Sequence, residues 1–297
     1  MKHDVCAFYR FVELDDLPAL QKKIKAFAAT YDACGTILIA NEGINGTIAA
    51  PEGGNLEPVI DYLDELAGVR SGELKYSFAS DRPFTRFKVR LKKEIITMKQ
   101  PDADPNKQVG TYVTAEEWNN LLDDPEVILL DTRNTYETDI GIFKGAVDPR
   151  IETFTEFSEY VEKELDPAKH KKVAMYCTGG IRCEKASSYM LAKGFENVYH
   201  LHGGILKYLE CIPADQSKWE GECFVFDKRV AVGHGLEEGD HKLCFGCRMP
   251  LNPEDLKSDA YEPGVSCPHC IEKLTEERAH MLRHRQGQLR EHDIKSD

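Results

Sequence analysis

The chain has 297 residues, with 38 Lys and Arg against 51 Asp and Glu, giving a formal net charge of −13. This length allows two or three domains, and 41% apolar content is typical of a folded protein rather than a disordered or collagen-like one. The acidity argues against indiscriminate nucleic-acid binding, and no run of about 18 apolar residues exists that could span a membrane.

The first hundred residues predict a ferredoxin-like βαββαβ domain. Strand-like runs occur at 5–12, 36–40, 47–50 and 84–98, and apolar residues recur at helical spacing over 17–28 and 56–67. The turn-rich stretch from Asn41 to Gly46 indicates a hairpin or tight loop between the middle strands. Residues 101–108 are polar, contain two prolines and predict a linker.

Residues 109–220 show a different pattern of predicted strands and helices. Short apolar strands at 127–130, 173–176 and 198–201 alternate with helical segments at 115–122, 154–165 and 183–193. This alternation predicts a parallel sheet covered by helices on both faces. Functional loops of such sheets lie at the carboxyl ends of the strands.

One such loop joins a strand ending at Tyr176 to a helix starting near Cys183. Its two glycines let successive backbone N–H groups point inward as an anion cradle, which the helix N-terminus and Arg182 make more positive. A thiolate at Cys177 would be stabilised there, so we expect a nucleophile with a lowered pKa. The alternative is a structural cysteine in a glycine turn. The predicted cradle residues are Thr178, Gly179, Gly180 and Ile181.

The length of this loop separates two chemistries. Phosphatases place five residues between the Cys and the Arg, whereas four residues separate Cys177 from Arg182. The smaller loop favours a persulfide on Cys177 over a bound phosphate. Cys183 is a hypothetical second thiol that resolves or accepts this sulfur, and the alternative is a buried cysteine at the helix start.

The block at 109–213 resembles the rhodanese family. Its landmarks are Leu130-Asp131-Thr132-Arg133, Gly145-Ala146, Cys177-x-x-Gly180-x-Arg182 and Leu201-His202-Gly203-Gly204. The resemblance implies that Cys177 carries the persulfide and that Asp131 and Arg133 form a buried ion pair. The family's usual Gly-His-Ile is replaced here by Gly141-Ile142-Phe143-Lys144.

The chain as a whole is similar to the bacterial rhodanese-domain tRNA uridine hydroxylases. The matching segments are residues 41–47, 87–94, 177–187 and 219–227. This resemblance implies oxygen-dependent formation of 5-hydroxyuridine at the wobble position of tRNA, with molecular oxygen as co-substrate. No iron triad, flavin motif or NAD motif is visible, so an electron donor or sulfur donor would be a further partner.

The C-terminal region, residues 221–297, contains two Cys-x-x-Cys pairs separated by 19 residues. Two such knuckles at this distance are typical of a tetrahedral four-thiolate zinc site. The alternatives are a redox dithiol pair or thiols without a ligand. The predicted structural zinc ligands are Cys244, Cys247, Cys267 and Cys270, with His269 a weaker candidate.

Residues 81–100 are an exception to the acidic composition, because they hold seven basic and two acidic residues. Cations alternate there with apolar residues, and the period of two places them on one face of a strand. Such a row suits an RNA phosphate backbone, and the alternative is an ordinary solvated edge. The predicted RNA-binding residues are Arg82, Arg86, Lys88, Arg90, Lys92 and Lys93.

These observations predict an α/β protein with a ferredoxin-like, tRNA-binding domain at 1–100, a linker at 101–108, a rhodanese-like catalytic domain at 109–220, and a zinc-binding extension with a charged helical tail at 221–297. We expect a cytoplasmic tRNA uridine hydroxylase, an oxidoreductase acting with molecular oxygen. The alternatives are a sulfurtransferase that relays persulfide sulfur from Cys177 and a non-catalytic RNA-binding adaptor. The absence of a secretory signal favours the cytoplasm, where thiols stay reduced.

Overall fold

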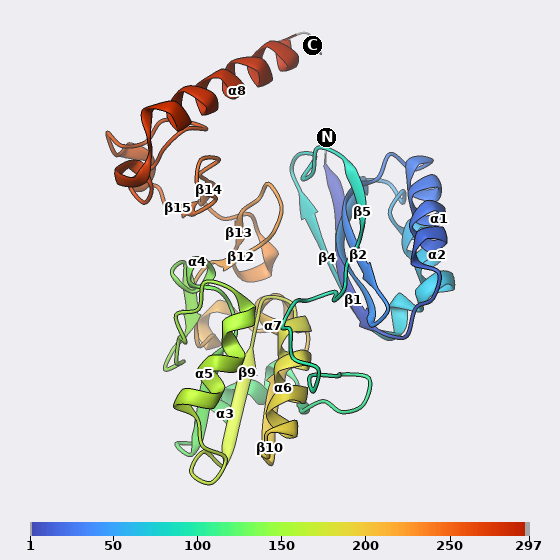
Figure 1. The fold of residues 1–297 in the computed structure, drawn as a ribbon, viewed down its shortest axis with the longest axis vertical. Coiled ribbons are helices and arrows are strands. Elements are labelled where there is room, and N and C mark those ends of the chain that lie inside the picture. The colour runs from blue at the N-terminus through green and yellow to red at the C-terminus, as the bar shows by residue number, and fades with distance from the viewer. Residues whose placement is uncertain (1, 295–297) are drawn as a thin grey trace.

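The computed structural model describes residues 2–294. They form two α/β units built on separate sheets, followed by a C-terminal segment that ends in a long helix (Figure 1). Among these residues, no helix is both long and apolar enough to cross a lipid bilayer.

The N-terminal unit has a five-stranded sheet in the order β4-β1-β3-β2-β5, in which β5 runs parallel to β2. The predicted ferredoxin-like arrangement is confirmed. Its elements are β1 (His3–Phe11), α1 (Leu17–Ala29), β2 (Cys34–Ala40), β3 (Gly43–Pro51), α2 (Glu57–Ala67), β4 (Glu73–Ala79) and β5 (Phe87–Leu91).

One strand prediction in this unit is wrong. The last strand of the βαββαβ unit is β4, which pairs with β1, and not a single strand over 84–98. The shorter β5 is an additional edge strand, and the chain leaves the sheet after it because Glu94 accepts the backbone N–H groups of Met98 and Lys99 in a turn. Met98 is fully buried against the second unit.

Helices α1 and α2 cover the face of this sheet that points away from the rest of the molecule (Figure 1). Ile24 and Ile60 from the helices pack on Ile37 and Ile48 from the strands, and each is 1% exposed or less. The helix-facing side is therefore an ordinary apolar core. The opposite sheet face is turned toward the second unit.

The second unit has the predicted parallel sheet, in the order β6-β10-β9-β7. Trp118 and Ile205 belong to the core on one face, and Phe157 and Met190 to the core on the other. The strands are β6 (Thr111–Val113), β7 (Val127–Asp131), β9 (Lys172–Tyr176) and β10 (Asn197–Leu201), and the main helices are α3 (Ala115–Leu122), α5 (Phe157–Glu164), α6 (Ile181–Ala192) and α7 (Gly204–Cys211).

The C-terminal segment connects the two units. Its strand β11 (Trp219–Gly221) pairs with β8 (Gly141–Phe143), and β12 (Cys223–Phe224) pairs with β13 (Ala231–Val232). Arg229 reaches the N-terminal sheet by donating to the Ser77 hydroxyl at 2.8 Å and the Phe78 carbonyl at 3.1 Å. The chain continues through β14 (Lys242–Leu243), β15 (Pro250–Leu251) and α8 (Glu276–Ile294).

Candidate functional site

The loop between β9 and α6 presents Cys177 at the carboxyl end of the sheet, between the two units. Gly180 has a φ of 100°, and a Cβ there would lie 2.7 Å from the Tyr9 hydroxyl, so a side chain at this position would be both strained and obstructed. The Gly180 N–H donates to the Cys177 sulfur at 3.1 Å. The backbone curl thus directs an amide at the sulfur.

The environments of Cys177 and Cys183 move their pKa values in opposite directions. Burial opposes ionisation of Cys177, but the Cys183 thiol, the Arg182 charge and backbone N–H groups outweigh it and lower the pKa of Cys177. Burial and the neighbouring Cys177 raise the pKa of Cys183, which lies 3.6 Å from the Thr132 hydroxyl. The two shifts favour a thiolate at Cys177 and a protonated, hydrogen-bond-donating thiol at Cys183.

Arg182 does not supply the uncompensated positive charge that the sequence predicts. Its guanidinium group makes two hydrogen bonds to the carboxylate of Glu137, at 2.6 and 2.7 Å, and both side chains are buried. Glu137 also accepts from the Thr178 hydroxyl at 3.1 Å. Glu137 also accepts the backbone N–H of Asn134 at 3.2 Å, but no sequence pattern predicts its pairing with Arg182.

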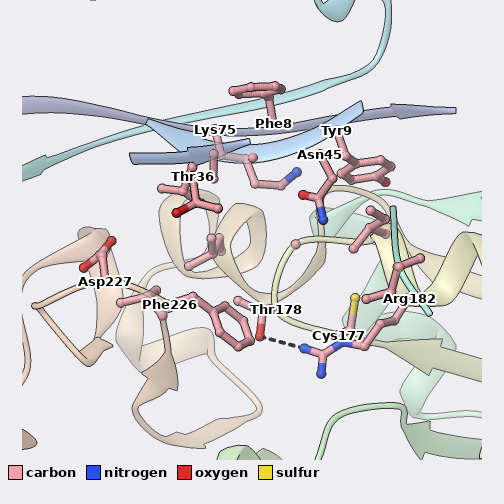
Figure 2. A pocket seen from close by; sticks show the side chains of 18 of the residues that line it. Phe8, Tyr9, Thr36, Asn45, Lys75, Cys177, Thr178, Arg182, Phe226 and Asp227 are labelled. Carbon is pink, nitrogen blue, oxygen red and sulfur yellow. Dashed lines mark hydrogen bonds between the residues drawn. The ribbon is translucent and has the colours of Figure 1, made fainter. Parts of the chain in front are cut away.

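A cavity of about 410 Å³ opens above this loop. Cys177, Thr178 and Gly179 line it from the loop side, and Phe226 borders it from the β12–β13 turn (Figure 2). The opposite wall is the open face of the N-terminal sheet. The sheet residues that line the cavity include Tyr9, Thr36, Leu38, Asn45, Thr47 and Lys75.

Buried polar contacts hold the two units in this arrangement. The Tyr9 hydroxyl donates to Glu184 at 2.7 Å. The Lys185 ammonium, 2% exposed, contacts both Glu42 and Glu94, at 2.9 and 2.6 Å. Glu42, in the turn between β2 and β3, thus contacts the opposing helix α6. Asn45 lies within β3 and faces the cavity.

Sequence reasoning missed Lys75 entirely. This residue lies in β4, its side chain is 6% exposed, and it lines the cavity with Cys177 (Figure 2). Its ammonium group contacts Glu73 at 3.2 Å, and Glu73 contacts His202 of the second unit at 2.6 Å. Only the alternation of charged and apolar residues in β4 could have indicated it.

The predicted basic row lies beside the cavity on the same sheet. Lys88 and Arg90 pair in register with Thr36 and Leu38, which line the cavity, so all four side chains share one sheet face. Within the row, Arg86, Arg90, Lys92 and Lys93 are exposed and Lys88 is half-buried. Arg82 forms an ion pair with Asp32 at 3.0 Å. RNA binding by this row stays a prediction.

The four cysteines of the C-terminal segment meet in one cluster. The sulfur atoms of Cys244, Cys247, Cys267 and Cys270 all lie within 4.8 Å of one another and could hold a metal ion. His269 instead contacts Asp255 at 3.1 Å. The apolar core around these cysteines is small. Among the residues that the structure describes there, Leu251 is the only fully buried one besides cysteines.

Comparison with known proteins assigns both units. Residues 3–95 match the UPF0176 acylphosphatase like domain, and residues 114–211 match the rhodanese-like domain. The solved rhodanese-like domain of an Anabaena protein is 22% identical over 37% of this chain and 78% of that chain, with a TM-score of 0.31. A rhodanese-related protein from Thermoplasma volcanium is 25% identical over 35% of this chain and 95% of that chain, with a TM-score of 0.28. The two domains are identified by the family models and the topology rather than by these low TM-scores.

Proposed function

We propose that this chain, which has the domain architecture of the UPF0176 family, hydroxylates the wobble uridine of tRNA to 5-hydroxyuridine in an oxygen-dependent reaction. The observation that carries the proposal is the composite cavity. Its base holds the Cys177 thiolate, its far wall is the N-terminal sheet, and cations of β5 continue along that wall. The nucleophile thus faces the sheet surface that also carries cations of β5, and such cations suit a phosphate backbone.

The cavity suits a single flipped-out base. Its volume of about 410 Å³ falls within the range of small-molecule sites, about 300–1,000 Å³. Phe226 is 59% exposed at its border and offers an aromatic face on which a base can stack. Asn45, whose amide donates to the Ile95 carbonyl, keeps its own carbonyl available for an N–H of a pyrimidine.

The basic row accounts for RNA binding by an acidic protein. Arg86, Lys88, Arg90 and Lys92 follow one edge strand, where alternate side chains are spaced about 6.8 Å apart, near the spacing of successive phosphates. The remaining surface carries the excess of negative charge, which disfavours other nucleic-acid contacts. One strand therefore directs the anticodon arm toward the cavity.

The reaction as proposed uses molecular oxygen as co-substrate. One oxygen atom enters C5 of uracil, and reduction of the other to water requires a two-electron donor, which we propose as a further partner. The chain's own contribution is to bind the tRNA, expose one base to Cys177 and limit water around it.

We further propose that the C-terminal cysteine cluster holds structural zinc. Tetrahedral zinc–sulfur bonds of about 2.3 Å place sulfur atoms about 3.8 Å apart. The Cys247–Cys267 and Cys267–Cys270 sulfur distances are both 3.7 Å. The donor set and spacing therefore fit zinc, which would order a segment with little apolar core of its own.

A specific observation also favours a second function, persulfide sulfur transfer. The four-residue loop leaves room for one added sulfur atom rather than a phosphate, and the lowered pKa of Cys177 suits attack on a sulfur donor. In this function the product would be a thiolated acceptor instead of a hydroxylated base.

Mass spectrometry of tRNA nucleosides from a strain lacking this gene separates these functions. We expect loss of 5-hydroxyuridine and its derivatives, restored by the wild-type chain and by Cys211→Ser, which alters an exposed cysteine, but not by Cys177→Ala. Loss of thiolated nucleosides would instead indicate the sulfurtransferase. An unchanged nucleoside profile would indicate a non-catalytic RNA-binding adaptor.

A further inference from the structure

One buried cation that lines the cavity, Lys75, has no role in the site as described so far. Arg182, the residue expected to face an anion at Cys177, has both terminal nitrogens committed to Glu137. Lys75 approaches from the opposite wall, on a different domain, with its ammonium group directed into the cavity (Figure 2). Its charge interacts with that of Cys177, so each favours the ionised form of the other.

Burial of a lysine at this position is costly and therefore calls for a reason. Desolvation lowers the pKa of Lys75, whereas Glu73 and Cys177 oppose that effect. Glu73 takes one of the three ammonium hydrogens, at 3.2 Å, and leaves donors for the cavity. The ring of Tyr9 lies 5.4 Å from the same nitrogen atom and supplies a further cation contact.

The position of Lys75 depends on the contact between the domains. Glu73 is held at 2.6 Å by His202, which belongs to the rhodanese-like domain and follows β10 directly. Lys75 therefore shares a cavity with Cys177 only while the two domains are docked. Neither domain alone contains both the nucleophile and this cation.

We propose that Lys75 is a second catalytic residue, whose ammonium group holds the Cys177 sulfur as the thiolate and donates a hydrogen bond to a carbonyl oxygen of the bound base. Glu73 and His202 are positioning residues for it. The base-binding half rests on the proposed function, because uracil offers carbonyl oxygens at C2 and C4. The pairing of Lys75 with Cys177 stands independently of the substrate.

The pairing is tested by the pH dependence of Cys177 alkylation in the full-length protein. Iodoacetamide reacts with the thiolate, and peptide mass spectrometry reports Cys177 separately from the other cysteines. An opposite charge favours the ionised form of a titrating group. We expect Lys75→Met to raise the inflection, and each unit of that rise slows alkylation about tenfold at pH values below the inflection.

Matched variants separate this effect from a general loss of structure. Lys75→Arg keeps the charge and is expected to keep the inflection near its wild-type value. Lys169→Met removes an exposed cation at the opposite end of β9 and is expected to change nothing. His202→Gln weakens the hold on Glu73 and is expected to shift the inflection in the direction of Lys75→Met, by a smaller amount. An inflection that is the same in Lys75→Met and wild type would overturn the pairing.

The base-binding half is tested in the complemented deletion strain. We expect Lys75→Met to lower 5-hydroxyuridine at least about 100-fold, the lower end of the range for loss of one hydrogen-bond donor to a reacting carbonyl group, while Lys169→Met retains it. Full hydroxylation in Lys75→Met would overturn the catalytic assignment. If wild type itself restored no 5-hydroxyuridine, the proposed function would fail, yet a shifted alkylation inflection would still support the pairing of Lys75 with Cys177.

Discussion

Replacing Glu137 with Gln tests whether a buried ion pair builds the Cys177 loop. The Glu137 side chain is fully buried and Arg182 is 7% exposed, so the substitution leaves the guanidinium group without its counter-charge away from water. It also weakens the bond from the Thr178 hydroxyl. Removing one partner of a buried ion pair costs about 3–5 kcal/mol. We expect a loss of unfolding free energy of that size.

The assay is denaturant unfolding of the full chain, followed by tryptophan fluorescence. The two tryptophans, Trp118 and Trp219, both pack in the rhodanese-like core and report on that domain. Glu162→Gln is the matched control, because its ion pair with Lys193 at 2.9 Å is solvent-exposed and is worth less than about 1 kcal/mol. A loss below about 1 kcal/mol in Glu137→Gln would refute the reasoning.

Three further perturbations have defined outcomes. Cys183→Ala removes a donor to the thiolate, so the inflection of Cys177 alkylation with pH should rise, and an unchanged or lower inflection would contradict the assignment. Chelation or Cys267→Ser should abolish amide-exchange protection over 244–270 while leaving the tryptophan-reported transition unchanged, and retained protection would argue against a structural metal. Lys185→Met removes the counter-charge of Glu42 and Glu94 at the interface, so amide exchange should increase in the 92–99 segment. Equal exchange in wild type and variant would exclude a role for Lys185 in docking the two domains.

The fold can be predicted from the sequence wherever buried residues recur at the regular spacing of a strand or a helix. Strands β7 and β9 contain the continuous apolar runs 127–130 and 173–176, and the Cys177 loop combines a cysteine, two glycines and an arginine within residues 177–182. The strand β4 escaped prediction because its cavity face carries Glu73, Lys75 and Ser77, polar side chains that a second domain covers. The sequence shows the alternation of polar and apolar residues in β4, but it does not show that a second domain buries the polar face.

The electrostatics of the site could not be predicted for a related reason. Glu137 and Arg182 are 45 residues apart, and Glu42 and Lys185 are 143 residues apart, so only the fold brings each pair together. Lys75 and Cys177 line one cavity from two different domains. The spacing of residues along the sequence identifies those that act within one loop or one helix. It does not predict which charged residues meet between domains.

The proposed function requires the cavity at Cys177 to direct an oxygen atom from molecular oxygen to C5 of the wobble uridine. Cells of the deletion strain complemented with the wild-type chain can be grown under ¹⁸O₂ and their tRNA nucleosides analysed by mass spectrometry. We expect 5-hydroxyuridine carrying ¹⁸O with the wild-type chain and none with Cys177→Ala. Unlabelled 5-hydroxyuridine, or labelled product in the Cys177→Ala strain, would contradict it.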